Sequence, residues 1–127
     1  MRASQIWIAV LFVVCLAGVC SSSEAVAADN FGAISYSNTS GAYGYSYDYP
    51  SRGQAEERSV NECSKRGKGC KVVLWFRNAC GALATGTNYG YGFAWAANRS
   101  EAEQVALKYC QKYTDSCKIA VWTCTTR

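Results

Sequence analysis

The chain has 127 residues, of which 50% are hydrophobic and 17% are charged, with eight cysteines and no histidine. Because histidine is absent, the sequence excludes a Ser-His-Asp triad, a Cys-His nucleophile pair and a histidine-ligated metal site. Thirteen Lys and Arg against nine Asp and Glu give a net charge of +4, which suits partners from an anionic cell-wall polymer to an acidic protein surface.

The N-terminal segment is typical of a secretory signal peptide, predicted over residues 1–27. A short basic start precedes an almost continuously apolar stretch at 6–19, and Ala-Val-Ala-Ala at 25–28 offers a small-x-small cleavage site. The apolar stretch is shorter than the roughly 20 residues that span a bilayer, so we expect no transmembrane segment after cleavage. The mature chain, residues 28–127, is expected to be secreted or periplasmic.

Copy one of an internal repeat, about residues 31–78, predicts a strand, a strand, a helix and a strand. The first strand covers 31–37 and ends in turn residues. At 43–49 tyrosine alternates with small or polar residues, which indicates a strand with one aromatic face. Ser51 caps the helix, with Gln54 three residues later, and the third strand at 71–76 is β-branched and aromatic.

Copy two, about residues 79–127, has the same order of elements. Cys110 and Cys117 lie 47 residues after Cys63 and Cys70, and the aromatic strand aligns with residues 89–95 at an offset of 46. Asn98, 47 residues after Ser51, caps the helix of copy two. Two copies predict one duplicated domain of the α+β class, with a mainly antiparallel sheet and two helices on one face.

Cysteine usage predicts three disulfides. Removing the leader leaves six cysteines, which are Cys63, Cys70, Cys80, Cys110, Cys117 and Cys124. Six cysteines in a small exported domain are typical of a disulfide framework. The repeat favours Cys63–Cys70 and Cys110–Cys117, which leaves Cys80–Cys124. We expect neither a metal nor a cofactor, since six residues separate the cysteines within each of the first two pairs and no histidine completes a zinc site.

Several short motifs form a set that resembles a known family. They are Gly-Ala-Ile-Ser-Tyr-Ser at 32–37, Ser-Arg-Gly-Gln-Ala-Glu at 51–56, Cys-Lys-Val-Val at 70–73 and Asn-Ala-Cys-Gly-Ala-Leu-Ala at 78–84. The chain from 30 to 124 resembles a family of small exported bacterial proteins known as a domain of unknown function. The resemblance implies a bacterial, exported, single-domain protein. It brings no catalytic residue and no cofactor with it.

The third strands offer the best candidate binding surface. Their purely apolar side chains are expected to face the helices: Val72, Leu74, Phe76, Ile119 and Val121. Trp75 and Trp122, together with Lys71 and Lys118, would then lie on the less covered face and form a binding site. In the alternative, a loop buries both tryptophans.

Two other features leave alternatives open. The aromatic strands at 43–49 and 89–95 pack their rings either under the helices as core or on an open sheet face that suits a sugar or a flat protein partner. The basic turn, Lys65, Arg66, Lys68 and Lys71, is expected to be a solvated loop tip. Nucleic acid is not an expected partner, because copy two has few cations there and the chain is exported.

Carboxylates could serve a glycan hydrolase. Asp48 with Glu103 is the pair that would act as acid and base on a glycosidic bond. The candidates are Asp29, Asp48, Glu56, Glu57, Glu62, Glu101, Glu103 and Asp115. The competing interpretation is that those in the first helical turns stabilise the helix dipole.

The combined features predict a non-catalytic, exported binding protein. We expect an inhibitor or immunity-type partner of a secreted or envelope enzyme. A cell-wall or carbohydrate-binding module is the first alternative, and a small glycan hydrolase is the weaker one.

Overall fold

The computed structural model describes residues 28–126, so the predicted signal peptide lies outside the described residues. The elements are β1 (Phe31–Tyr36), β2 (Tyr43–Tyr49), α1 (Arg52–Ser64), β3 (Lys71–Arg77), β4 (Cys80–Thr85), the 3-10 turn η1 (Thr87–Tyr89), β5 (Tyr91–Ala96), α2 (Arg99–Tyr113) and β6 (Lys118–Cys124). The α+β class and the order strand-strand-helix-strand in each copy are confirmed.

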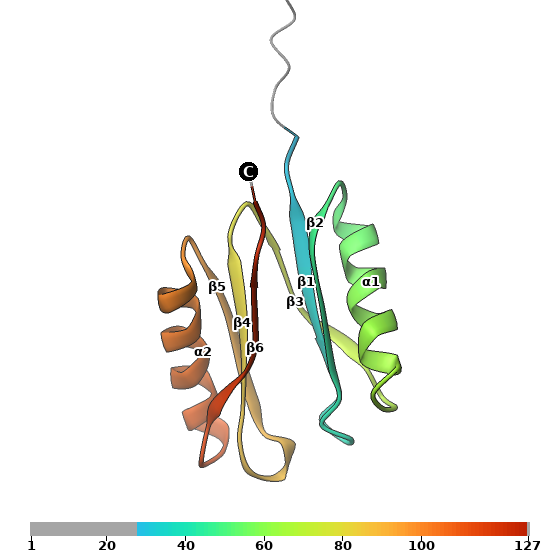
Figure 1. Ribbon diagram of the computed structural model, residues 1–127. Helices are drawn as coiled ribbons and strands as arrows, with labels where there is room; N and C mark the ends of the chain where they lie inside the picture. The colour runs from blue at the N-terminus through green and yellow to red at the C-terminus, as the bar shows by residue number, and fades with distance from the viewer. Residues whose placement is uncertain (1–27, 127) are drawn as a thin grey trace, which may run out of the picture.

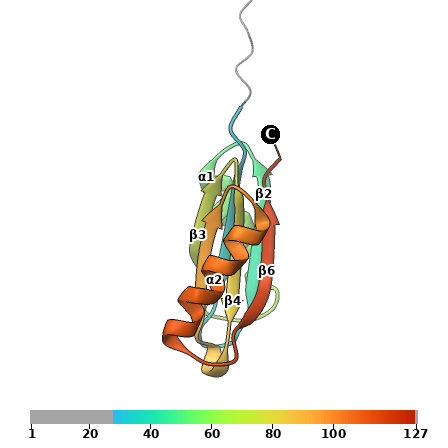
Figure 2. The ribbon, with the colours of Figure 1, turned by 90° about the vertical axis from the view of Figure 1, so that its left-hand side faces the viewer.

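The strands form two antiparallel sheets of three strands, in the orders β2-β1-β3 and β5-β4-β6. The sheets lie face to face, with α1 and α2 on the two outer faces (Figure 1, and Figure 2 from the side of α2). The expected single sheet with both helices on one face is therefore replaced by four layers. Each copy covers one face of its sheet with its own helix and the other face with the sheet of the other copy.

Small residues let each helix lie close to its sheet. A Cβ on Gly44 of β2 would lie 2.2 Å from the backbone N of Cys63 and the carbonyl O of Ser59 in α1. Beside it, the Ser46 hydroxyl donates to the carbonyl of Ala55 at 2.6 Å. Gly92 of β5 meets α2 in the same way. The Gly, Ser and Ala face of each aromatic strand therefore packs on its helix, and the rings lie on the opposite face.

Gly44→Ala is expected to destabilise the protein by about 1–3 kcal/mol, because the added methyl meets helix backbone that cannot move aside as a flexible side chain can. Urea unfolding of both proteins measures the difference. Gly53→Ala is the control, since Gly53 lies in α1 with no atom within 4 Å of the added Cβ. This control should raise stability by about 0.5–1 kcal/mol. Equal stability of the two variants would contradict the close contact.

The main apolar core lies between the two sheets. Its large side chains come from the inner strands and the third strands of both copies, and are Ile34, Tyr36, Leu74, Phe76, Leu83 and Val121. The expectation that the apolar set of the third strands faces the helices is therefore wrong for Leu74, Phe76 and Val121. Helices that sit on glycine, serine and alanine leave no room for large side chains, so these fill the wider space between the sheets.

The structure also corrects the alignment of the two aromatic strands. Gly44 and Gly92 occupy equivalent positions against their helices, so the offset there is 48 (92 minus 44) rather than 46. The first sheet pairs Phe31 with Tyr49 and Ala33 with Ser46, with a shift of register between them, whereas the β4–β5 register runs without a shift. Asp48, at a φ of 60°, lies in this β-bulge.

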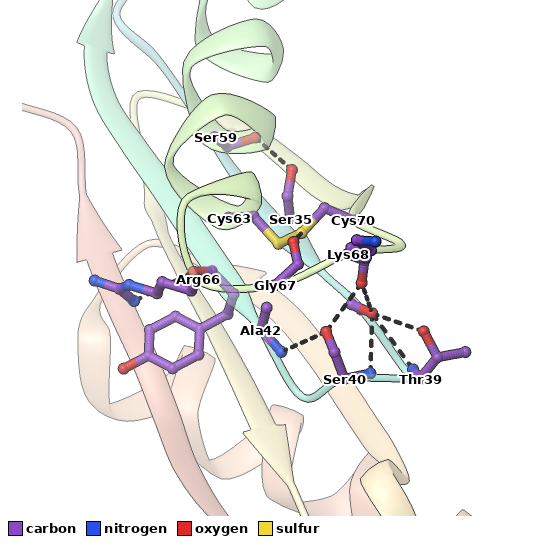
Figure 3. Close-up of a disulfide and its surroundings, with 12 residues drawn as sticks. Ser35, Thr39, Ser40, Ala42, Ser59, Cys63, Arg66, Gly67, Lys68 and Cys70 are labelled. Carbon is purple, nitrogen blue, oxygen red and sulfur yellow. Dashed lines mark hydrogen bonds between the residues drawn. A yellow bond between two sulfur atoms is a disulfide. The ribbon is translucent and has the colours of Figure 1, made fainter.

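All three predicted disulfides are formed, Cys63–Cys70, Cys110–Cys117 and Cys80–Cys124. Two of them link a helix end to the next strand, and Figure 3 shows the first of these beside the basic turn. Three disulfides are typical of proteins that mature outside the reducing cytoplasm. Within residues 28–126, no helix is long and apolar enough to cross a bilayer.

Candidate functional site

The two tryptophans of the predicted binding surface lie on the helix side of their sheets, each under an arginine. The guanidinium carbon of Arg52 lies 4.4 Å from the centroid of the Trp75 ring, and that of Arg99 lies 3.7 Å from the centroid of Trp122. Each arginine starts a helix and also pairs with the glutamate four residues later. The two tryptophans are therefore held in equivalent cation–π contacts, one in each copy.

Lys71 and Lys118 do not join these tryptophans. Lys71 pairs with Tyr36 and Trp75 with Ala33, residues whose side chains lie on opposite faces of β1, and a shift of register separates the two pairs. Lys118 and Trp122 are separated by the same kind of shift on β6. Because a bulge adds one residue, it reverses the alternation of side chains beyond it. The predicted Trp–Lys surface is not assembled.

A different site lies along the outer edges of β3 and β5. A groove of about 1130 Å³ runs there, and one wall continues onto α2. The aromatic residues that η1, β5 and α2 contribute to it are Tyr89, Tyr91, Phe93, Trp95, Tyr109 and Tyr113. We call this the aromatic groove. Trp75 lines it from β3, whereas Lys71, Lys118 and Trp122 do not.

Local sequence explains how these rings come together. In β5 the alternation of side chains sends Gly92 and Ala94 to the helix and the rings of Phe93 and Trp95 away from it. In α2 the stripe Val105, Tyr109 and Tyr113 has a spacing of four, so it lies along one side of the helix. Tyr109 was missed by sequence reasoning, although this spacing next to the buried alanine stripe is a readable signal.

Tyr36 fixes the η1 end of the groove. Its hydroxyl donates to the carbonyl of Tyr89 at 3.0 Å, and its ring lies 5.0 Å from that of Tyr91 between centroids. Burial raises the pKa of the Tyr36 phenol, and the neighbouring phenols of Tyr89 and Tyr91 raise it further. The phenol therefore stays a hydrogen-bond donor at neutral pH and holds the turn in place.

Copy one has a counterpart to this groove, with different chemistry. A smaller hollow of about 480 Å³ lies beside Tyr45 to Tyr49 and is walled by Arg58 and Glu62 of α1 and by Arg66 of the turn that follows. These three residues stand 47 positions before Val105, Tyr109 and Tyr113. We call it the charged groove. Glu62 pairs with Arg58 and with Lys65, each at 3.0 Å. The hydrogen bond from Lys65 and the charges of its basic neighbours lower the pKa of the Glu62 carboxyl.

The basic turn stays at the surface, where its residues make local contacts. Lys65 pairs with Glu62, while the Arg66 guanidinium carbon lies 4.6 Å from the centroid of the Tyr43 ring. The carbonyl of Lys68 accepts the Ser40 hydroxyl at 2.9 Å, as the dashed lines in Figure 3 show. The turn is thus fastened to the loop after β1.

The proposed acid and base carboxylates lie on different layers. Asp48, in β2 of the first sheet, accepts two hydrogen bonds from Thr126, from its N–H at 2.6 Å and its hydroxyl at 2.7 Å. Glu103 lies on α2 outside the second sheet and pairs with Arg99 at 2.5 Å. Both carboxylates therefore have structural partners. Among residues 28–126, no group of three Cys, Asp or Glu side chains is placed to hold a metal ion.

Residues 31–124 match the family model described as Domain of unknown function (DUF4189). The chain belongs to this family. The resemblance drawn from the short motifs is thereby confirmed. Since the match covers both copies, the DUF4189 domain includes both grooves.

Relatives of this DUF4189 chain come from mycobacteria. Over 58 residues it is 48% identical to Protein Rv1269c of Mycobacterium tuberculosis and to Protein Mb1300c of Mycobacterium bovis, which is 46% of this chain and 44% of each relative. The match thus spans less than half the length of these relatives. The NMR structure of Rv1813c from Mycobacterium tuberculosis is similar, with a TM-score of 0.56 and 27% identity over 75% of this chain and 74% of that chain.

Proposed function

We propose that this DUF4189 protein is a non-catalytic, exported binding protein whose aromatic groove holds a protein partner. Its role would be that of an inhibitor or immunity-type partner of a secreted or envelope enzyme. The observation that carries the proposal is the difference between the grooves of the two copies: the larger one is lined by aromatic side chains, and the smaller one is walled by paired charges.

Exposed rings in a concave site support protein binding. Trp95 is 62% exposed and Tyr113 is 76% exposed, which leaves large apolar surfaces in contact with water. Clustered apolar surface of this kind marks interaction sites on soluble domains. Tyr and Trp are enriched in such sites because they supply a large contact area with few rotatable bonds.

Comparison of the two copies separates structural from functional features. The stack of Arg52 on Trp75 recurs in copy two as Arg99 on Trp122, so it serves the fold of each unit. Tyr109, in contrast, stands where copy one has Glu62. A position that lines a groove in both duplicated units, but is aromatic in one and charged in the other, is best explained by a task that only the aromatic groove performs.

Disulfides make the groove rigid. Cys110, in the last turn of α2 between Tyr109 and Tyr113, is bonded to Cys117 just before β6. The helical wall of the groove is thereby fixed to the second sheet. A site that is ordered before binding loses less conformational entropy when a partner binds.

A carbohydrate-binding module is the second candidate. The exposed faces of Trp95 and Tyr113 would suit stacking against sugar rings. A protein inhibitor binds one protein at near-equal stoichiometry, whereas a wall-binding module sediments with purified peptidoglycan. The two candidates therefore separate in one experiment with two arms.

Tyr109→Glu, which places the residue of copy one in the aromatic groove, is expected to weaken partner binding at least about 30-fold. The reason is that binding would remove water from a carboxylate, even one paired with Lys112, and would replace ring contact with a charge. The oxidised mature chain is incubated with envelope and secreted fractions of the host and, separately, with purified wall. The Kd of each recovered species is then measured for wild type and variant.

Glu62→Gln in the charged groove is the matched control and should leave partner binding unchanged. Far-UV circular dichroism of both variants checks the fold. Unchanged partner binding by Tyr109→Glu would overturn the assignment of the groove. Sedimentation with wall alone would overturn the protein-partner proposal in favour of the carbohydrate module.

A further inference from the structure

We propose that the aromatic groove binds an extended peptide segment of the partner as an added strand on the free edge of β5. The segment is apolar in the middle and acidic at both ends. This inference rests on the proposed function and names the element of the partner that is recognised.

The backbone of β5 presents hydrogen-bonding groups to the groove. The N–H of Gly86 donates to the carbonyl of Gly90 at 2.8 Å, which sets the alternation of the β4–β5 ladder. In an antiparallel pair, every second residue bonds its partner and the residues between turn their N–H and C=O away. Tyr91, Phe93 and Trp95 are therefore the residues whose backbone groups point outward. Because β5 is the outer strand of its sheet, these groups face the groove.

The free edge of β5 lacks the features that protect the matching edge of β2 in copy one from strand pairing. In copy one, the carbonyl of Tyr43 accepts a hydrogen bond from Arg66 at 3.2 Å. Asp48 lies in a bulge and is bonded to Thr126. Bulges and charged side chains are how proteins protect exposed edges from strand pairing. In copy two the register is regular, and Tyr113 takes the place of Arg66.

The groove also has walls for the side chains of an added strand. Side chains of a strand alternate between two faces, so the segment would place one set against α2 and the other against β3. Val105 and Tyr109 line the groove from α2, while Val73 lines it from the face of β3 that packs toward the second sheet. This combination of an edge strand with a neighbouring helix is suited to recognising a peptide by strand addition.

Charge complementarity points to acidic ends. Among the described residues that line the groove there is one cation, Arg77, and no carboxylate. Arg77 lies at the Trp95 end, because Cys80, three residues later, pairs with Ala96. The contact of Arg77 with Asp29 is 3.5 Å long and exposed, so a peptide carboxylate can compete for it. At the other end, the Nζ of Lys112 lies 4.9 Å from the centroid of the Tyr109 ring.

The test uses the oxidised mature chain and a synthetic peptide, acetyl-Glu-Val-Thr-Val-Thr-Val-Glu-amide. We expect it to bind at least about tenfold tighter than the same peptide with Lys at both ends or with alternate backbone nitrogens methylated. On binding, the amide exchange of Phe93 and Trp95 should slow about tenfold or more. Equal binding of all three peptides, or unchanged exchange at both amides, would overturn the proposal.

Two substitutions of Phe93 isolate the contribution of its backbone N–H to peptide binding. Phe93→Ala removes the ring, whereas Phe93→Pro removes the ring and the outward N–H but no bond to β4. We expect Phe93→Pro to bind the peptide and the recovered partner at least about tenfold more weakly than Phe93→Ala. Tyr45→Pro, at the equivalent position of β2, is the control and should bind as wild type does.

The outcomes separate this inference from the proposed function. If Tyr109→Glu weakens partner binding while Phe93→Pro and Phe93→Ala bind the partner equally, strand addition is wrong and the function stands. If neither Tyr109→Glu nor Phe93→Pro affects the partner, both are wrong. Self-association in sedimentation velocity that is lost in Phe93→Pro would overturn the peptide in favour of a second copy as the occupant.

Discussion

Phe76→Ala is expected to lower the free energy of unfolding by about 3–5 kcal/mol. The Phe76 ring is 2% exposed and lies between the two sheets. A Cβ on Gly32 would lie 2.4 Å from this ring, and one on Gly81 would lie 2.5 Å from it, so the two equivalent glycines leave the space that the ring occupies. Since neither glycine has a side chain that could fill the gap, the cavity left by the variant cannot collapse locally.

Urea unfolding of oxidised wild type and variant measures this effect. Thr123→Ala is the matched control, because Thr123 stands 47 residues after Phe76 and is also buried. It should cost roughly 1 kcal/mol, close to the average of single substitutions. A loss below that value for Phe76→Ala would mean that the sheets pack against each other without the ring.

The local elements could be read from the sequence because their signals are local. Ser51 accepts a hydrogen bond from the N–H of Gln54, and Asn98 accepts one from the N–H of Glu101, as the cap motifs predict. The three disulfides followed from the duplication, since Cys63–Cys70 and Cys110–Cys117 tie each helix to the next strand. Once these two pairs were assigned, Cys80 and Cys124 were the two cysteines left to form the third.

The stacking of the two sheets between the two helices could not be predicted from the sequence in the same way. Alternation shows that the two faces of β3 differ, but it does not say whether a helix or a sheet covers the apolar face. The bulge next to Val73 then reverses the alternation without any sequence mark such as Gly or Pro. Because of this extra residue, Lys71 and Trp75 lie on opposite faces of β3, and the predicted Trp–Lys surface does not form.

The aromatic groove depends on contact between the copies. Its walls come from β3 in one copy and from β5 and α2 in the other, and no spacing along the chain relates Trp75 to Tyr109. The sequence did contain one clue, which is the replacement of Glu62 and Arg66 by Tyr109 and Tyr113 in the second copy. In a duplicated chain, such differences between equivalent positions indicate where a difference in function between the copies can be sought.

Replacing Cys80 and Cys124 by alanine is expected to cost about 4 kcal/mol, against about 2.5 kcal/mol for the pair Cys63 and Cys70. The difference arises because the first bond closes a loop with a sequence separation of 44 and the second a loop with a separation of 7. A longer closed loop removes more conformational entropy from the unfolded chain. Urea unfolding of both double variants, with the other two bonds kept oxidised, measures the two costs.

The Cys80–Cys124 bond also holds the end of copy two in place. It joins β4 to β6, and the chain beyond it returns to copy one, where Thr126 donates to Asp48. Loss of this bond should therefore loosen the charged groove as well, which faster amide exchange at Thr126 would report. If both double variants lost the same free energy, the stabilisation would come from local packing around each bond rather than from loop closure. In that case the hydrogen bonds of Thr126 should survive in both.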